Sequence, residues 1–460
     1  MPPPTLFSGL VGLARTDITP RVGIYCRNWG AATTQTARGI HRPLLLSAIA
    51  VRESAASLPL VLLDADLGWW TSLAHERGIR QRVQAALGLT DERLLTCVTH
   101  THSAPPLCPP ADHWQGGDLL AAYHDQLEQA MISTARAAID ACEPAVIDWT
   151  RGRCSLAADR DLPDPSPRAN PRLVCGYNPA QPADDTVVVA RITATTGKLL
   201  GTITNYACHP TTLAWQNELV SPDYVGAMRE TIEQAVGGLS LFLQGASGEL
   251  APRYQYVGDP AVADAHGAEL GYAVLAAMSA MEPPGEQLTY SRVVESGAPL
   301  AIWERGPVPL TPRSTSVAAI RRTVDIPLKN WPTTAELAEQ FAGCSDNALK
   351  ERLRRQLHIR EGLGDGQTFP LELWGWRVGE ALLLGTLAES YSSIQANVRN
   401  AFPDRELTWL NIVNGWAGYL PPAARYDEDV YQVWQTPFDR GSLELVESAA
   451  IDLGRELLIS

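Results

Sequence analysis

Two histidines, two residues apart, stand where an apolar stretch of the sequence gives way to prolines. Residues 94–98 are apolar and partly β-branched, which is typical of a buried strand. His100 and His102 follow, and the alternation of side chains in an extended chain predicts that both imidazoles face one side. Pro105 then prevents further pairing in a sheet. The pattern fits a metal site in a cleft, and it equally fits two hydrogen-bonded histidines at a strand end.

A third histidine ends a second predicted strand in the same manner. Residues 186–192 and 199–208 predict a hairpin, and His209 and Pro210 follow its second strand. The proline favours an extended conformation for the residue before it. Because both histidine-bearing strand ends are stopped by proline, a shared metal site is better supported by the pair than by either motif alone.

Two aspartates and one arginine are further candidates. Asp64 and Asp66 end another predicted strand, where they would either orient a metal-bound histidine or cap a turn. Arg27 lies in a loop with Asn28 and Trp29, and it would either contact the substrate or pack on the surface. The sequence leaves both alternatives open.

A segment rich in small residues follows the predicted strand at 240–243. It reads Gln244-Gly-Ala-Ser-Gly-Glu249, and residues such as Gly245 allow the backbone to approach a ligand closely. Its amides would then be placed to bind an oxyanion. A plain turn between a strand and a loop is the alternative.

The elements around these motifs predict an α/β protein with mixed β-sheets and flanking helices. Ser221 and Pro222 are typical of the first residues of a helix. Further strands are expected at 44–51, 58–63, 371–378, 381–385 and 407–413. Other helices are expected at 72–87, 117–141, 259–282 and 442–458, and one is expected to begin near Ser390.

We expect one domain over residues 1–460, because this length suffices for a single large core. Residues 290–330 favour strands and 333–361 favour two charged surface helices, so 290–365 is expected to be a subdomain or an insertion. Residues 155–185 hold many proline, aspartate and asparagine residues. They are predicted to leave the core as a long loop bordering a site.

Composition restricts the partners and the location. A formal net charge of −14 argues against nucleic acid and anionic membrane surfaces. No apolar stretch approaches the roughly 20 residues of a membrane span. The eight cysteines never form Cys-x-x-Cys, and the first residues lack the basic and apolar parts of a signal peptide. We therefore expect a cytoplasmic protein that acts on a small molecule, as a monomer or a homo-oligomer.

Five stretches together resemble the catalytic domain of the neutral ceramidase family, a group of zinc-dependent amidases. They follow the family's order between residues 10 and 255, whereas the carboxyl-terminal part matches more loosely. The five are Gly12-Leu-Ala-Arg-Thr-Asp-Ile-Thr-Pro20, Asp66-Leu-Gly68, Thr99-His-Thr-His-Ser103, Asn205-Tyr-Ala-Cys-His-Pro-Thr211 and Gly248-Glu-Leu-Ala-Pro252. The resemblance implies that family's α/β fold.

The resemblance also implies one Zn²⁺ ion held by two histidines, a glutamate and a tyrosine. The first histidine of the His-Thr-His motif corresponds to His100, and the histidine before proline corresponds to His209. The glutamate corresponds to Glu389, which here follows alanine. The tyrosine corresponds to Tyr419, with Tyr426 as a rival.

The same resemblance implies roles in catalysis and substrate binding. His102 would lie beside the metal and polarise water or substrate, and Tyr419 would be a labile ligand that moves as substrate enters. Gly245 is expected to contact the substrate, and so is Arg27, for the latter because of its place in the loop described above and not because of the resemblance. Gly245 takes the place of a serine to which the family assigns a direct part in amide cleavage. We expect no counterpart of the family's carboxyl-terminal immunoglobulin-like domain in these 460 residues.

We therefore expect zinc-dependent hydrolysis of an amide, or a related acyl bond, in a small molecule other than ceramide. Zinc lowers the pKa of a bound water and polarises a carbonyl group. One alternative is a biosynthetic enzyme that uses zinc as a Lewis acid to form or cyclise an amide or ester. Another is a metal-free binding protein on the same scaffold, against which the retained ligand set argues.

Overall fold

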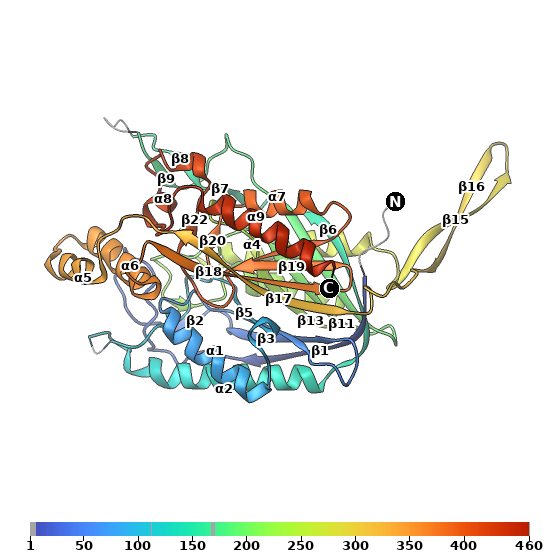
Figure 1. Ribbon diagram of the computed structural model, residues 1–460, viewed down its shortest axis with the longest axis horizontal. Coiled ribbons are helices and arrows are strands. Elements are labelled where there is room, and N and C mark those ends of the chain that lie inside the picture. Colours follow the sequence, from blue (N-terminus) through green and yellow to red (C-terminus); the bar gives the residue numbers. More distant parts are fainter. Residues whose placement is uncertain (1–5, 112, 167–170, 460) are drawn as a thin grey trace.

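An eight-stranded sheet and a four-stranded sheet pack face to face in the computed structural model, which describes residues 6–111, 113–166 and 171–459. Helices cover the outer faces of both sheets (Figure 1). The mixed sheets and flanking helices confirm the fold class predicted from the sequence.

The eight-stranded sheet contains the predicted hairpin and the strand before the His-Thr-His motif. Its order is β13 (Leu239–Gln244), β11 (Leu199–Tyr206), β10 (Thr186–Ala194), β6 (Glu143–Arg153), β1 (Leu6–Asp17), β3 (Leu45–Arg52), β4 (Leu60–Ala65) and β5 (Leu94–Val98). Only the outermost pairs, β13 with β11 and β4 with β5, are parallel. Because the carboxyl ends of parallel strands lie on the same side of a sheet, the loops that follow the two strands of each pair lie close together.

This sheet curves until its two edges approach each other. β13 lies against β4 and β5, although they stand at opposite ends of the strand order. The Phe242 amide donates to the Asp64 carboxylate at 3.0 Å, and Asp66 binds the Arg229 guanidinium through two bonds of 2.6 Å. Asp64 therefore joins the two edges of the sheet, whereas Asp66 is held by an arginine from a covering helix, and the predicted role of these aspartates in orienting a histidine is wrong.

The four-stranded sheet packs on the inner face of the larger one. Its order is β17 (Val317–Pro327), β18 (Thr368–Val378), β19 (Ala381–Thr386) and β21 (Leu407–Asn411), and β19 and β21 are parallel. The alternation of side chains fills both layers of the core. In β10, Val188 and Ala190 face the four-stranded sheet, whereas Val187 and Val189 pack with α3 (Tyr224–Val236) and α4 (Pro260–Ser279).

The long helices lie where the sequence predicts them, with one correction. α1 (Leu73–Leu87) packs on α2 (Asp118–Asp140), which covers β1, β3 and β4. α3 (Tyr224–Val236) and α4 (Pro260–Ser279) cover β13, β6 and β10, and α9 (Ser442–Leu457) covers the four-stranded sheet beside α7 (Ser393–Ala401). α3 begins after Asp223, whose carboxylate caps it, so the predicted start at Ser221 is wrong.

Segment 290–365 divides into three parts. β15 (Glu286–Glu295) and β16 (Pro299–Pro307) form a hairpin that extends away from the sheets (Figure 1). β17 joins the four-stranded sheet, and α5 (Thr334–Gly343) and α6 (Asn347–Leu363) follow. The two helices confirm the prediction for 333–361. α6 nevertheless buries Ile359 and Arg360, so it is not confined to the surface.

Short paired strands lie among the loops near the ends of the longer strands. They are β2 (Gly39–Ile40) with β12 (Leu219–Val220), β7 (Ala157–Asp159) with β14 (Leu250–Pro252), β8 (Asp161–Pro163) with β9 (Leu173–Cys175), and β20 (Glu389–Ser390) with β22 (Tyr419–Leu420). The remaining helix α8 (Tyr431–Gln435) and two 3₁₀ turns (Asp91–Arg93 and Ala423–Arg425) lie between longer elements. Arg160 and Asp161 are buried, so this part of 155–185 belongs to the core against expectation. None of the described helices is long and apolar enough to span a membrane.

Candidate metal centre

Three side chains from distant parts of the sequence converge near the carboxyl ends of the strands. One ligand atom of each of His100, His209 and Glu389 lies within 4.8 Å of the others. All three residues are at most 2% exposed. They follow β5, β11 and β19, and each of these strands belongs to a parallel pair.

The His-Thr-His segment leaves the sheet before its first histidine. β5 ends at Val98, and His100 has a φ of 68°, in the left-handed region that most side chains avoid. The two imidazoles therefore do not share a side by strand alternation, and that part of the prediction is wrong. Their rings still lie close, with centroids 5.2 Å apart and planes at 87°.

Hydrogen bonds fix the orientation of both histidine rings. His209 Nδ1 lies 2.6 Å from the Ser247 carbonyl oxygen and 3.2 Å from that of Leu250. His100 Nδ1 lies 3.3 Å from the Gly68 carbonyl oxygen. A carbonyl can only accept, so in each neutral ring the hydrogen sits on Nδ1 and Nε2 carries a lone pair.

Both lone pairs point at the same carboxylate oxygen. Glu389 Oε2 lies 2.9 Å from His209 Nε2 and 3.4 Å from His100 Nε2. The other oxygen, Oε1, accepts the indole hydrogen of Trp416 at 2.7 Å. Three acceptor atoms facing one another repel, unless a cation lies between them or a proton is bound there. The donor set therefore fits a metal ion held by two nitrogens and one oxygen.

The electrostatics favour the charge states that metal ligands require. Burial raises the pKa of the Glu389 carboxyl, but His100 and His209 outweigh it and hold that pKa well below its usual range. Burial, aided by the nearby Arg160 guanidinium, lowers the pKa of His209 to about 4 against the pull of Glu389. The glutamate is thus ionised and His209 is neutral at pH 7.

Glu389 is held by a strand pair that the sequence did not indicate. β20 pairs in parallel with β22 and sets Glu389 opposite Tyr419. The Glu389 amide donates to the Gly418 carbonyl at 2.8 Å. α7 begins only at Ser393, so the helix expected near Ser390 starts later and the carboxylate is not at a helix N-terminus.

The Tyr419 side chain lies beside the three ligands. Its ring stacks on that of His209 with centroids 6.4 Å apart, and its hydroxyl accepts from Arg160 Nη2 at 3.2 Å. Burial and then Glu389 raise the pKa of Tyr419 well above 10, although Arg160 lowers it. Tyr426, the rival, donates its hydroxyl hydrogen to the Phe438 and Asp439 carbonyls instead.

His102 is close to the cluster but does not belong to it. Its ring centroid lies 5.0 Å from that of Trp29 and 4.8 Å from that of Trp69. Both ring nitrogens are shielded from solvent and have no hydrogen-bond partner among the described residues. Burial, together with His100 and His209, lowers the pKa of His102 well below its usual value. Its neutral ring is therefore available to a ligand or a water molecule.

The glycine-containing segment is already occupied by internal hydrogen bonds. The amides of Gly245, Ala246 and Gly248 donate to the Tyr206 carbonyl, the Gln395 side chain and the Ser390 carbonyl at 2.9 Å each. These three are not free to bind an oxyanion, which contradicts the role predicted for the segment. Contact of Gly245 with substrate stays a prediction.

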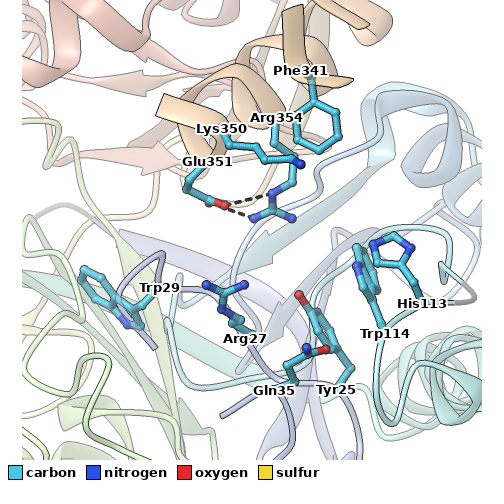
Figure 2. A pocket seen from close by; sticks show the side chains of 10 residues that line it. All are labelled: Tyr25, Arg27, Trp29, Gln35, His113, Trp114, Phe341, Lys350, Glu351 and Arg354. Carbon is cyan, nitrogen blue, oxygen red and sulfur yellow. Dashed lines mark hydrogen bonds and ion pairs between the residues drawn. The ribbon is translucent and has the colours of Figure 1, made fainter. Parts of the chain in front are cut away.

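Arg27 lines a cavity of about 400 Å³ next to the cluster. Figure 2 shows its guanidinium directed into this cavity, with Tyr25 and Trp114 on one side and Trp29 on the other. Trp29 connects the cavity with the metal centre, because its ring also contacts that of His102. The position suits the substrate contact predicted for Arg27.

Sequence reasoning missed several residues of the site. Arg160 is 4% exposed and joins Tyr419 to the Gly248 carbonyl, which its Nη2 reaches at 2.6 Å. Trp69 lies against the His100 ring and also contacts Trp416, whose indole binds Glu389. Arg160 gave no local signal, because it lies in a polar segment without periodicity. Trp416 lies in a loop quoted for Tyr419 and could have been noticed there.

The comparisons with known proteins agree on one family. The family model described as neutral/alkaline non-lysosomal ceramidase, N-terminal, matches residues 10–251. The neutral ceramidase of Pseudomonas aeruginosa is 24% identical over 251 residues, which are 52% of this chain and 36% of that protein.

Solved structures share the fold. The crystal structure of neutral ceramidase from Pseudomonas aeruginosa matches with a TM-score of 0.68 and 18% identity, over 99% of this chain and 75% of that one. A ceramidase complexed with C2 matches with a TM-score of 0.67 and 18% identity, over 99% of this chain and 76% of the other.

Proposed function

The chain belongs to the neutral/alkaline non-lysosomal ceramidase family, and from this premise we propose that it is a metal-dependent hydrolase of an amide bond in a small molecule. The observation that carries the proposal is the convergence of His100 Nε2 and His209 Nε2 on Glu389 Oε2, at 3.4 Å and 2.9 Å. Buried acceptors in this arrangement call for a cation.

We propose Zn²⁺ as that cation. Two imidazole nitrogens and one carboxylate oxygen are a ligand set that catalytic zinc sites use, with a further position left for water or substrate. Tyr419 is the proposed fourth protein ligand, and it would be a labile one that gives up this position to the substrate. When bound, zinc polarises a carbonyl oxygen and makes a water molecule more acidic.

The surrounding residues have separate tasks in this proposal. His102 accepts a proton from the attacking water, since neither of its ring nitrogens is engaged by the described residues. Arg160 donates a hydrogen bond to the Tyr419 oxygen. While Tyr419 is protonated, its own hydroxyl hydrogen therefore stays available to the substrate. Trp69 and Trp416 exclude bulk water around the ligands and so strengthen each of these interactions.

We propose that the substrate is not ceramide. Gly245 stands in place of the serine of the family's pattern, and a Cβ atom there would lie 2.9 Å from Gln395 Oε1 and 3.1 Å from the Ala207 nitrogen. A serine does not fit without movement of these groups. The cavity beside the centre is also lined by charged side chains, which suit a polar molecule better than a long hydrocarbon chain.

The second candidate function is formation or cyclisation of an amide or ester, because the same electrophilic metal serves both directions. Analysis of the products decides between the two. A hydrolase converts an N-acyl compound and water into the free acid and amine, whereas a synthetic enzyme transfers the acyl group of an activated donor to an amine or hydroxyl group and releases the donor's leaving group.

Location and association are proposals as well. All eight cysteines are free thiols, which suits a cytoplasmic, reducing compartment. Thiol titration of freshly purified protein should therefore give eight thiols per denatured chain. Self-association into a homo-oligomer stays a prediction, which the molar mass in solution will decide.

The test of the proposed function combines metal removal with hydrolysis. Chelation should abolish cleavage of N-acyl amides, and one equivalent of zinc should restore it. Glu389→Gln should lack this restoration, whereas Glu372→Gln, another buried carboxylate outside the cluster, should retain it. Hydrolysis that survives both chelation and Glu389→Gln would overturn the proposal.

A further inference from the structure

The cavity next to the metal centre carries positive charge in an otherwise acidic protein. Three cationic side chains line it, Arg27, Lys350 and Arg354, against a single described carboxylate, Glu351. The chain as a whole has a formal net charge of −14. Such a local reversal of sign marks a place where anions accumulate.

Arg27 has no anionic partner in the described part of the chain. Its one hydrogen bond runs from Nη2 to the Gly30 carbonyl oxygen at 2.9 Å, and its buried Nε has no acceptor among the described residues. A guanidinium with donors to spare, directed into a cavity, is suited to bind an oxyanion through two parallel hydrogen bonds (Figure 2).

The charges on α6 complete the arrangement. Lys350 Nζ lies 5.2 Å from the centre of the Phe341 ring, and it forms no ion pair within the described residues. Arg354 binds Glu351 through two bonds of 3.0 Å and 2.8 Å, while Glu351 also accepts from Arg355 Nε at 2.9 Å. Since one carboxylate is shared by two arginines, it leaves the charge of Arg27 and Lys350 uncompensated.

Aromatic rings form the remaining walls and lead toward the metal centre. Tyr25 and Trp114 stack with centroids 4.4 Å apart and planes at 7°. Trp29 lies between the cavity and His102, with its centroid 5.0 Å from that of the imidazole. A cavity of about 400 Å³ is the size of a small-molecule site.

We propose that this cavity selects substrates that carry an oxyanion group, a carboxylate or a phosphate. With the scissile bond at the metal centre, the substrate would extend past Trp29 and place this anionic group in the cavity. The inference rests on the proposed function and names its substrate class, an anionic N-acyl compound. Arg27 and Lys350 bind the anion, and the aromatic walls bind the uncharged part.

The experiment measures binding and turnover separately with three N-benzoyl probes. N-benzoylglycine carries a carboxylate, N-benzoylethanolamine phosphate carries a phosphate, and N-benzoylethanolamine is neutral. Calorimetric titration of the metal-free protein gives the dissociation constants, and the zinc-loaded protein gives kcat/KM. We expect the better anionic probe to bind at least about tenfold more tightly than the neutral probe.

Charge-removing variants assign this preference to residues. Arg27→Gln and Lys350→Gln should each weaken binding of the anionic probes by about tenfold or more and leave the neutral probe unchanged, while Arg27→Lys should retain part of the preference. Arg136→Gln is the matched control, because this exposed arginine also has one bond to a backbone carbonyl, that of Ala86 at 2.9 Å. Lys198→Gln is the control for the exposed lysine charge.

The outcomes separate the two proposals. Equal binding of neutral and anionic probes, or variants that weaken all three probes alike, would overturn the anion site. Binding that depends on Arg27 without cleavage of any amide would overturn the proposed hydrolase and support the site. The stronger anionic probe identifies the carboxylate or the phosphate as the natural group.

Discussion

Each histidine of the centre is oriented by the main chain and not by another side chain. The Ser247 and Gly68 carbonyls accept the Nδ1 hydrogens, so both rings present Nε2 to Glu389. Main-chain acceptors survive substitution of their own side chains. The tautomer of both histidines is therefore set by the main chain of the fold, whereas the proposed metal binding depends on the ligand side chains themselves.

Tyr419 and Tyr426 provide a matched pair of substitutions. Tyr419→Phe should keep most of the metal, since three ligands remain, but should lower kcat by about 100-fold or more because a proton donor is lost. Tyr426→Phe should leave both metal content and kcat near the wild-type values, since that hydroxyl binds the Phe438 and Asp439 carbonyls. Metal analysis and steady-state kinetics check the pair. The reverse pattern would assign the tyrosine ligand to Tyr426.

Glu249 should make the stability of the protein depend on pH. Burial raises its pKa from an ordinary 4.5 to about 8, although hydrogen bonds from Ser392 oppose the shift. The folded state thus binds this proton more tightly than the unfolded chain, and the stability it contributes is complete below about pH 4.5 and is lost as pH rises to 8.

Glu249→Gln removes this titration. Relative to wild type, the variant should gain free energy of unfolding between pH 5 and pH 8, by at most about 1.4 kcal/mol per pH unit. Urea unfolding of the metal-free proteins at several pH values gives the difference. A difference that does not change with pH would refute the assignment of this proton to Glu249.

At the scale of elements, the loop that carries Trp416 and Tyr419 is fastened to the strand that precedes His100. Asn414 Oδ1 accepts from the Thr96 amide at 2.7 Å and the Thr96 hydroxyl at 2.9 Å, and its Nδ2 donates to the Leu94 carbonyl at 3.2 Å. One side chain thus joins the end of the four-stranded sheet to the edge strand of the other sheet, and so joins the two halves of the metal centre.

Asn414→Gly tests this junction without backbone strain, because Asn414 has a φ of 54° that glycine adopts easily. Loss of three buried hydrogen bonds should destabilise the protein by about 2–3 kcal/mol and weaken zinc binding. Asn397→Gly is the comparison variant, and we expect a smaller loss of stability from it, since this exposed side chain has a single hydrogen bond, to Glu447. Chemical unfolding and zinc titration measure both effects. An unchanged zinc affinity would show that the junction does not position the ligands.

The sequence predicted well the strands that precede His100 and His209. Apolar runs such as residues 94–98 and 199–206 have a local periodicity, so β5, β11 and the hairpin that delivers His209 were found. The β20–β22 pair was not, because each strand has two residues and their pairing is set by contacts far apart in the sequence. Asp64 and Asp66 were misinterpreted for the same reason, since their partners on β13 and α3 lie more than 160 residues away.

At the scale of the whole molecule, one hydrophobic core runs through both sheets. It includes Phe7 and Val11 of β1 together with Trp374 and Trp376 of β18 and Leu453 of α9. The β15–β16 hairpin takes no part in it, because its strands pair only with each other among the described residues and their side chains are largely exposed.

We therefore predict a single cooperative thermal transition for the chain, including β17, α5 and α6. Zinc should raise the transition temperature, since the proposed three-residue site exists only in the folded protein. Replacement of residues 287–306 by a short Gly-Ser turn should leave both the transition and the metal content nearly unchanged. Calorimetry checks the prediction, and two separate transitions would instead establish 290–365 as an independent subdomain.

The central claim is that His100, His209 and Glu389 bind a metal ion, and anomalous X-ray scattering at the zinc edge tests it most directly. A crystal of the zinc-loaded protein should show one strong peak about 2.0–2.2 Å from His100 Nε2, His209 Nε2 and a Glu389 oxygen. His100→Ala should lose the peak, whereas His124→Ala, which removes a buried histidine outside the cluster, should keep it. A peak elsewhere, or none at these three residues, would contradict the account.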